Sequence, residues 1–450
     1  MTKIKNFFNE DYISFAGYDN SRKIASLVDG LKTSQRKVLY TVLKNNIDSE
    51  QKEIKVEQLA AKTSEQTSYL HGATSLTGVA VGLATNYVGS NNINLLEPDG
   101  NFGTRFIRDA SAPRYIYTFL TDIAKYIYKK EDEPILLTQS FEGQTIEPKY
   151  YYPIIPMVLV NGSEGLSVGF SSNINPRDPK QLIKWLEYKL TNKTFKEDFT
   201  PYFKGFKGTI VKDNTSTDII KYIVKGDYIQ DNATQLTITE IPLKYTLKSY
   251  IKVLDTLCDK DIIKSYKDLS DNDIFKFEVK VKREFFDNKT KDDILQILKL
   301  TESLSDNMVL LNENGIIQEF NNIEEILNQY YTVRYKAYQE RKQYNLNKLV
   351  EDLDYHTEKA RFIQLVLAKT IKIDDSIQNI TNKLIELKFK QINDSYDYLL
   401  DMKISSLTQE RVQELNQKIS KLKEELQILT TTTIEEIWLK ELSILKSKLS

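Results

Sequence analysis

Several residue types and patterns are scarce in this 450-residue chain, and each scarcity excludes a class of function. The single cysteine, Cys258, excludes an internal disulfide. With only two histidines, His71 and His356, the chain cannot assemble a zinc site of the usual His/Cys kind. The formal net charge is −1, so binding to nucleic acid would have to depend on local clusters of Lys and Arg. The chain has no G-x-x-x-x-G-K-(S/T) loop, and we do not expect it to bind ATP.

Long apolar runs are also missing. The two most apolar segments, 76–89 and 150–162, are shorter than the roughly 18 residues that a membrane-spanning helix needs, and polar residues or prolines interrupt them. No membrane segment is therefore predicted. The start of the chain does not resemble a signal peptide, which together with the cysteine content predicts a reducing, cytoplasmic location.

Up to about Leu120, the chain is predicted to alternate helices with turn-rich loops. Residues 26–46 (SLVDGLKTSQRKVLYTVLKNN) predict an amphipathic helix with Arg36 and Lys37 on a basic, exposed side. Two further helices are expected on either side of the pair His71-Gly72. Helices joined by tight turns and followed by a loop are typical of a helix-turn-helix or winged-helix module.

The pattern changes in residues 147–321, which predict an α+β domain. Alternating apolar and polar residues predict strands at 205–211, 235–243 and 275–282, and residues 178–190 predict a helix. The chain as a whole is thus expected to be α+β and multidomain.

Residues 322–450 contain no glycine or proline and are expected to form long helices. Apolar residues near the end alternate spacings of three and four, which predicts one arm of an antiparallel coiled coil. The expected seam consists of Val412, Leu415, Ile419, Leu422, Leu426 and Leu429. The expected partner face carries Leu346, Leu349, Leu353 and His356.

The stretch 111–120 (SAPRYIYTFL) contains two tyrosines, Tyr115 and Tyr117. A tyrosine hydroxyl has a pKa near 10, so a nucleophilic tyrosine needs a nearby cation or base. The residues that could converge on Tyr115 are Arg114, Arg36, His71 and Arg105. Aromatic residues at this spacing are more often part of a half-buried element, and the residues alone leave both interpretations open.

Two other segments have competing interpretations. Asp271 and Asp273 could belong to a magnesium site, but a polar turn before a strand explains them better, and no metal site is expected. Residues 150–162 (YYYPIIPMVLVNG) predict a buried strand flanked by prolines. An aliphatic residue at such a turn could instead wedge between DNA base pairs, as in proteins that kink the minor groove.

Taken together and in this order, the segments resemble the DNA breakage-reunion subunit of type IIA DNA topoisomerases, the family of gyrase A, topoisomerase IV and eukaryotic topoisomerase II. The matching landmarks are LVDGLKTSQRKVLY, YLHGATSL, EPDGNFGTR, SAPRYIYTFL, YYPIIPMVLVNGSEGLSVGFSSNINP, LTITEIPL, SLSDNMVLLNENG and YLLDMKISSLT. The resemblance covers nearly the whole chain and looks closest to the medium subunit of the phage T4-like enzyme, which would place the protein in the cytoplasm of a host cell.

The resemblance implies a catalytic set. The family's Arg-Tyr pair falls on Arg114 and Tyr115, so Tyr115 would be the nucleophile and Tyr117 would pack. Arg36 and His71 match the family's active-site arginine and histidine, and both would surround the scissile phosphate with Tyr115.

The resemblance also implies DNA contacts. Ile155 corresponds to the family's intercalating isoleucine. The basic residues expected at the DNA are Lys37, Lys32 and Arg105. Where relatives often carry a second histidine and an acidic residue, this chain has Leu70 and Ala73, which makes the surroundings of His71 less polar.

The implied architecture has three parts. Residues 1–146 would form the winged-helix cleavage domain and residues 147–321 the tower domain. Residues 322–450 would form coiled-coil arms ending in a helical dimerisation gate at about 365–410, which holds a homodimer together. The implied function is ATP-dependent passage of one DNA duplex through another, with a covalent 5′-phosphotyrosyl intermediate. Magnesium and ATP would be bound by a Toprim domain and an ATPase domain on one or two separate partner chains.

The implied outcome on DNA is relaxation or decatenation, because no β-pinwheel segment follows the returning helix. Two alternatives belong to other classes. A non-catalytic, dimerising DNA-binding scaffold would keep the fold with a silent Tyr115. A site-specific tyrosine recombinase would also form a phosphotyrosine, but the early position of Tyr115 does not suit that class.

Overall fold

The computed structural model describes residues 7–214, 220–392 and 394–449. The chain divides into two compact units, Met1–Tyr335 with Leu439–Ser450 (unit 1) and Lys336–Trp438 (unit 2). The divisions fall within two helices, α11 (Ile323–Leu367) and α15 (Ile434–Lys448). The expected boundary after residue 146 lies inside unit 1, and the expected domain limits remain predictions.

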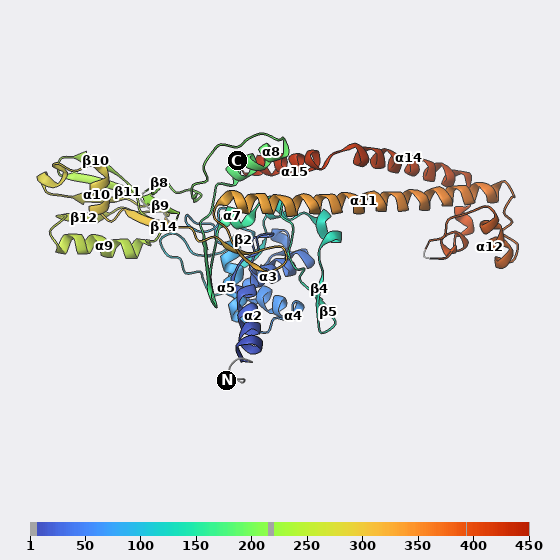
Figure 1. The fold of residues 1–450 in the computed structure, drawn as a ribbon, viewed down its shortest axis with the longest axis horizontal. Helices are drawn as coiled ribbons and strands as arrows, with labels where there is room; N and C mark the ends of the chain where they lie inside the picture. Colours follow the sequence, from blue (N-terminus) through green and yellow to red (C-terminus); the bar gives the residue numbers. More distant parts are fainter. Residues whose placement is uncertain (1–6, 215–219, 393, 450) are drawn as a thin grey trace. The chain divides into compact units, whose positions relative to one another are not determined.

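Unit 1 begins with helices that pack beside a small antiparallel sheet of order β1-β3-β2 (Figure 1). The helices are η1 (Phe7–Tyr12), α2 (Ile13–Lys23), α3 (Thr33–Lys44), η2 (Glu50–Lys52), α4 (Val56–Gln66), α5 (Ala73–Ala84), α6 (Asp122–Ile127) and η3 (Lys130–Ile135). The strands are β1 (Ile54–Lys55), β2 (Leu96–Asp99) and β3 (Tyr117–Leu120). Apolar residues of α3 at helical spacing, such as Val38 and Val42, are buried against the neighbouring helices.

The first part of α3 differs from the expectation. The helix predicted over residues 26–46 begins only at Thr33, because the preceding residues form a tight loop. Gly30 in this loop has φ of +71°, and a side-chain carbon there would lie 2.4 Å from the backbone nitrogen of Val158. Arg36 and Lys37, expected on an exposed side, are both buried.

Residues 150–162, all described, are buried as expected, but the strand prediction is wrong. Residues 150–156 do not form a strand, and α7 (Met157–Asn161) follows them. Pro153 and Pro156 lack the N–H groups that a strand ladder needs. The N–H of Ile154 instead donates to the carbonyl of Ile127 at 3.0 Å.

The predicted helix and strands of the middle region are confirmed. Residues 178–190 form α8 (Pro179–Leu190), whose N-terminus is capped by the Asp178 carboxylate. The three predicted strands are β8 (Thr209–Lys212), β11 (Gln235–Glu240) and β13 (Phe277–Lys280). They belong to a three-stranded sheet of order β14-β9-β8 and a four-stranded sheet of order β10-β11-β13-β12. The other strands of these sheets are β9 (Lys221–Lys225), β10 (Asp227–Asn232), β12 (Ser265–Asp268) and β14 (Thr301–Ser305).

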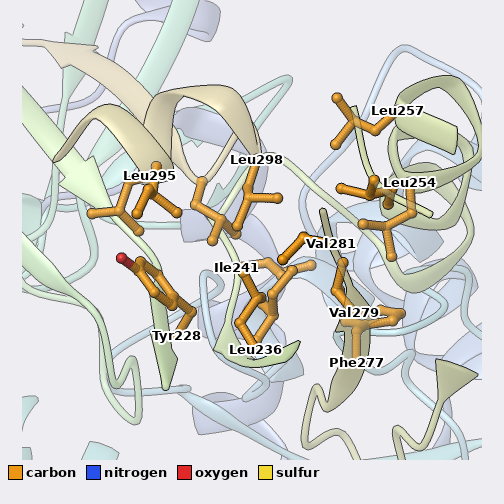
Figure 2. Close-up of a cluster of buried hydrophobic side chains, with 14 of the residues drawn as sticks. Tyr228, Leu236, Ile241, Leu254, Leu257, Phe277, Val279, Val281, Leu295 and Leu298 are labelled. Atoms are coloured by element: carbon orange, nitrogen blue, oxygen red, sulfur yellow. The ribbon is translucent and has the colours of Figure 1, made fainter. Parts of the chain in front are cut away.

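A separate hydrophobic core lies between the four-stranded sheet and two helices, α9 (Leu247–Asp259) and α10 (Lys291–Ile297) (Figure 2). Leu254 and Leu257 of α9 and Leu295 of α10 contribute to it, together with inward-facing strand residues. The short helix η4 (Arg283–Phe286) leads into α10. Unit 1 also contains three hairpins, β4 (Gln139–Phe141) with β5 (Gln144–Ile146), β6 (Ser163–Ser167) with β7 (Phe170–Ile174), and β15 (Val309–Leu311) with β16 (Ile317–Glu319).

Unit 2 is helical. Its elements besides parts of α11 and α15 are α12 (Ile377–Glu386), α13 (Asp397–Leu400), η5 (Ile404–Ser406) and α14 (Gln409–Thr431). Three residues of the expected seam, Val412, Leu415 and Ile419, pack with Ala360 and Ile363 of α11. The later seam residues at 426 and 429 are half-buried. Among the described residues, no helix has both the length and the apolarity needed to span a membrane.

Candidate functional site

Tyr115 stands at the end of a loop, shortly before β3. Its side chain is 69% exposed, whereas the next residue, Ile116, is buried. Tyr117 lies within β3 opposite Lys55 and is half-buried. The two tyrosines therefore differ in exposure, with the Tyr115 side chain facing solvent and Tyr117 half-buried in the sheet.

Arg114 is the basic residue that the structure brings to Tyr115. The guanidinium carbon lies 5.1 Å from the centre of the Tyr115 ring, a cation–π distance. Both side chains are exposed. Arg36, His71 and Arg105, which were expected to converge on Tyr115, have other partners in this structure.

His71 is exposed just before the start of α5 and lies between two tyrosines. Its Nε2 is 3.1 Å from the hydroxyl of Tyr18, and its ring centre is 5.4 Å from that of Tyr69. These side chains line a cavity of about 180 Å³ together with Lys37 and Glu147. The histidine therefore has a polar partner in Tyr18 and faces a cavity with cationic side chains.

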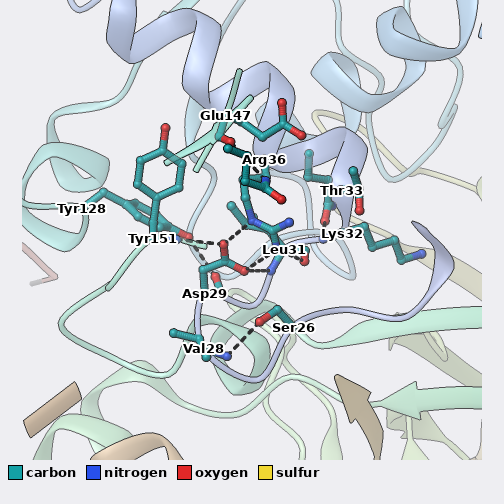
Figure 3. Close-up of polar contacts among 12 residues, drawn as sticks. Ser26, Val28, Asp29, Leu31, Lys32, Thr33, Arg36, Tyr128, Glu147 and Tyr151 are labelled. Atoms are coloured by element: carbon teal, nitrogen blue, oxygen red, sulfur yellow. Dashed lines mark hydrogen bonds and ion pairs between the residues drawn. The ribbon is translucent and has the colours of Figure 1, made fainter. Parts of the chain in front are cut away.

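Arg36 is buried in a network of hydrogen bonds centred on Asp29 (Figure 3). The guanidinium donates to both carboxylate oxygens of Asp29, at 2.6 and 3.0 Å, and to the carbonyl of Leu31 at 3.0 Å. Burial lowers the pKa of Arg36, but the adjacent Asp29 opposes this effect together with Glu147 and Tyr151, and the net result is a raised pKa. The structure thus places Arg36 in an ion pair, not in the open position that a phosphate contact requires.

Asp29 also joins this network to the segment that carries Ile155. Its carboxylate accepts the N–H of Leu31 at 3.0 Å and the N–H of Tyr151 at 3.1 Å. The hydroxyl of Tyr128 donates to the carbonyl of Asp29 at 3.1 Å. Sequence reasoning missed Asp29, although a buried arginine seven residues away needs such a carboxylate.

Lys37 and Lys32, which were expected at the DNA, also have partners within the chain. Lys37 is buried and pairs with Glu147 at 2.9 Å, and it donates to the carbonyl of Thr67 at 2.7 Å. Burial raises the pKa of Glu147, and Lys37 opposes that effect. Lys32 is half-buried and donates to the carbonyl of Glu164 at 2.5 Å, and burial lowers its pKa.

Ile155 and Arg105 are buried as well. Ile155 is fully enclosed, and the hydroxyl of Tyr330 donates to the nearby carbonyl of Pro153 at 2.6 Å. Arg105 pairs with Glu240 at 2.6 Å. Neither side chain is open to DNA in this structure, which differs from the expectation for both. No local sequence signal identifies Glu240 or Glu147, because each lies more than one hundred positions from its partner.

A metal site would need several His, Cys, Asp or Glu side chains close together. Within the described ranges, no group of three or more His, Cys, Asp or Glu side chains lies close enough to hold an ion. Asp271 and Asp273 lie in a polar turn before β13, as the preferred interpretation had it.

Comparisons with known proteins give this architecture a family. Residues 22–443 match the family described as the A subunit of DNA gyrase/topoisomerase IV. The mitochondrial DNA topoisomerase 2 of Dictyostelium discoideum is 34% identical over 460 residues, covering 99% of this chain and 35% of the relative. DNA topoisomerase 2 of Saccharomyces cerevisiae is 34% identical over 97% of this chain and 34% of its own length. The DNA topoisomerase 2 of Invertebrate iridescent virus 6 is 32% identical over 98% of this chain and 38% of its own length.

A solved structure agrees with these relatives. The DNA-binding, cleavage and re-ligation domain of Plasmodium falciparum topoisomerase II matches with a TM-score of 0.85 and 32% identity, covering 98% of this chain and 64% of that one. The chain spans about a third of the length of the curated relatives named above, which are eukaryotic and viral. Since the family match covers most of its residues, the chain belongs to the family of DNA gyrase/topoisomerase IV A subunits.

Proposed function

We propose that this chain cleaves and rejoins DNA as the breakage-reunion part of a type IIA topoisomerase, with Tyr115 as the nucleophile. The observation that carries the proposal is the placement of Tyr115. Its side chain is 69% exposed at a fixed point before β3, with the Arg114 guanidinium 5.1 Å from its ring. A nucleophile that must reach a DNA phosphate has to be exposed, and a neighbouring cation favours the reaction.

In this reaction the Tyr115 hydroxyl oxygen attacks the phosphorus of a phosphodiester and gives up its proton. The bond from phosphorus to the 3′ oxygen breaks, which releases a 3′-hydroxyl and leaves a 5′-phosphotyrosyl ester. Arg114 stabilises the negative charge that develops on the phosphate oxygens. Rejoining reverses these steps and needs no added energy, because the ester retains the phosphodiester bond energy.

His71 and Arg36 have supporting roles in the proposal. His71, exposed and bonded to Tyr18, would approach the scissile phosphate from the rim of its cavity. The guanidinium of Arg36 already donates to Asp29 and to the carbonyl of Leu31 in the folded chain. Arg36 would therefore support the site indirectly, through the hydrogen bonds of Asp29, and could contact a phosphate only after the ion pair opens. Lys32 and Lys37 would likewise have to exchange their present acceptors for phosphate oxygens.

Ile155 would wedge between base pairs only after leaving its buried position. Exposing a fully buried isoleucine side chain costs about 1.5–3 kcal/mol. Contact with unstacked bases would have to offset that cost and the cost of unstacking. The proposal therefore includes a local rearrangement of residues 150–156 when DNA binds.

The remaining parts rest on the family resemblance. Two copies of the chain would form a dimer through a gate in unit 2, so that two copies of Tyr115 cut opposite strands of duplex DNA. Magnesium would be bound mainly by a Toprim domain and ATP by an ATPase domain. As in the phage T4-like enzyme, these domains would belong to separate partner chains in the host cytoplasm, and the complex would relax or decatenate DNA.

Covalent trapping tests the proposal. The purified chain is mixed with its Toprim-bearing partner, magnesium and duplex DNA labelled at the 3′ ends, and the mixture is denatured and digested. We expect label on a peptide that contains Tyr115, loss of that label in Tyr115→Phe, and retention in the matched control Tyr117→Phe. DNA binding without any adduct would contradict the proposal and favour a dimerising scaffold. An adduct on another tyrosine would refute the assignment of Tyr115.

A further inference from the structure

The loop before Tyr115 contacts the four-stranded sheet through residues that have no part in the proposed reaction. Three residues of the loop, Arg105, Phe106 and Arg108, reach residues at or after the end of β11, or before β13. We call these contacts the clasp. The residues of the sheet side are Glu240, Ile241, Leu243, Asp273 and Phe275.

Arg105 is the centre of the clasp. Its guanidinium lies 2.6 Å from the Glu240 carboxylate and donates to the carbonyl of Ile241 at 2.7 Å. The guanidinium carbon also lies 4.7 Å from the ring centre of Phe275. The side chains of Arg105 and Glu240 are each 4% exposed. A guanidinium with a carboxylate, a carbonyl and an aromatic face around it has no surface left for a DNA phosphate.

The backbone of the loop is held at the same place. The Asp273 carboxylate accepts the N–H of Arg105 at 3.2 Å and the N–H of Phe106 at 3.3 Å. The ring of Phe106 lies 4.9 Å from that of Phe275. The polar turn that contains Asp273 thus has a specific role, since it receives the loop as well as reversing the chain.

The loop itself has little freedom between the clasp and Tyr115. The N–H of Thr104 donates to the carbonyl of Ile107 at 2.7 Å, and that of Ser111 to the carbonyl of Asn101 at 2.9 Å. Gly103 has φ of +88°, and a side-chain carbon there would lie 2.5 Å from the carbonyl oxygen of Arg108. The N–H of Tyr115 donates to the carbonyl of Ala112 at 2.9 Å. A shift at the clasp therefore moves the residues that hold Tyr115.

We propose that Arg105 and Glu240 are positioning residues that set the place of Tyr115 by fixing its loop to the four-stranded sheet. The inference rests on the proposed function of Tyr115 and goes beyond it, because it assigns a role to the sheet in aligning the nucleophile. It also replaces the expectation that Arg105 contacts DNA.

The two roles for Arg105 predict different effects of the substitution Glu240→Gln on DNA affinity. If Arg105 bound a phosphate, Arg105→Met would weaken DNA binding and lower the dependence of affinity on salt by about one ion. Glu240→Gln would then free the guanidinium and strengthen binding. If Arg105 belongs to a clasp, both substitutions lower adduct formation and leave DNA affinity and its salt dependence unchanged.

The experiment measures adduct yield and DNA affinity for Arg105→Met, Arg105→Lys and Glu240→Gln in the complex with the Toprim-bearing partner. We expect Arg105→Met to lower the rate of adduct formation by about tenfold to about a hundredfold, the range for a misplaced reacting group. Arg105→Lys, which keeps the charge, should recover part of this loss. The exposed lysine next to Phe275 provides the control Lys276→Met, which should match wild type.

Hydrogen exchange of the peptide 99–114 in the DNA-free protein gives an independent measurement. It should be faster in Arg105→Met and Glu240→Gln and unchanged in Lys276→Met. The double variant should exchange no faster than the worse single variant, because the pair acts as a unit. Unchanged exchange in both single variants would refute the clasp, whatever their rates of adduct formation.

The failures of the two proposals are distinguishable. A wild-type complex that forms no adduct through Tyr115 overturns the proposed function, while the exchange measurement still decides whether the clasp holds the loop. Wild-type adduct through Tyr115 with equal rates in Arg105→Met and Glu240→Gln overturns the positioning role alone. Weaker DNA binding in Arg105→Met with stronger binding in Glu240→Gln would show that Arg105 contacts DNA.

Discussion

Substitution of Asp29 by alanine should loosen two segments that are far apart in the sequence. The Asp29 carboxylate is fully buried and accepts two N–H groups from Arg36, one from Leu31 and one from Tyr151 (Figure 3). Removing one partner of a buried ion pair costs about 3–5 kcal/mol, because the other charge stays buried without compensation. Each unpaired backbone N–H adds about 1–3 kcal/mol. We take ~3 kcal/mol as the smallest expected loss.

Hydrogen exchange followed by mass spectrometry measures this loss locally. A decrease of ~3 kcal/mol in the free energy of local opening corresponds to exchange that is about a hundredfold faster. We expect this acceleration in peptides that contain Leu31 and also in peptides that contain Tyr151. Asp29→Asn keeps an acceptor but loses the charge, so its effect should be smaller. Acceleration around Leu31 alone would refute the conclusion that Asp29 joins α3 to the segment before Ile155.

Three further predictions follow from single contacts. Gly103→Ala should lower adduct yield and the melting temperature, because the new side-chain carbon would lie 2.5 Å from the Arg108 carbonyl oxygen. The control is Gly143→Ala, where φ is similar and no atom lies within 4 Å of the new carbon. This control should lose only the free energy of backbone strain, about 1–2 kcal/mol. Lys37→Met should raise the pKa of the buried Glu147 further, because the opposing cation is lost. A raised carboxyl pKa favours the folded state below the unfolded pKa, and this stability is lost as pH rises through the folded value. The melting temperature of Lys37→Met should therefore fall more than that of wild type as pH rises above the ordinary pKa of a glutamate. Leu415→Ala should destabilise unit 2 by about 2–5 kcal/mol in calorimetry, because the side chain is buried against α11. Equal melting of Leu415→Ala and wild type would contradict the packing of these helices.

The elements that sequence reasoning predicted correctly are those with a strong local pattern. The helix α8 has an Asp178 cap, a proline in its first turn and apolar residues at helical spacing. The strands β11 and β13 alternate apolar and polar residues because one face packs against α9 and α10. In α8 and β13 the burial pattern follows the period of the element, so the local sequence is enough to predict them.

Prediction from the sequence failed where one local pattern of residues is compatible with two different structures. The segment 150–156 is apolar and buried, but its two prolines deny it a strand ladder, and its polar groups bond to residues such as Ile127 and Tyr330 that are far away in the chain. Arg36 and Lys37 follow the spacing of an exposed helix face, yet both are buried. Burial of a charge depends on a partner, and no local window shows that Glu147 lies beside Lys37.

Five of the basic residues expected at the active site or the DNA divide into two groups that differ in burial and pairing. Arg114 and His71 are exposed, so a contact with a phosphate would cost little desolvation. Arg36, Lys37 and Arg105 already sit in buried ion pairs, so moving one of them to DNA would leave a carboxylate without its cation. Because that loss costs several kcal/mol, a phosphate contact by any of these three requires the carboxylate to find another cation or a proton. The same cost makes each of these ion pairs suited to holding its own segment in one arrangement.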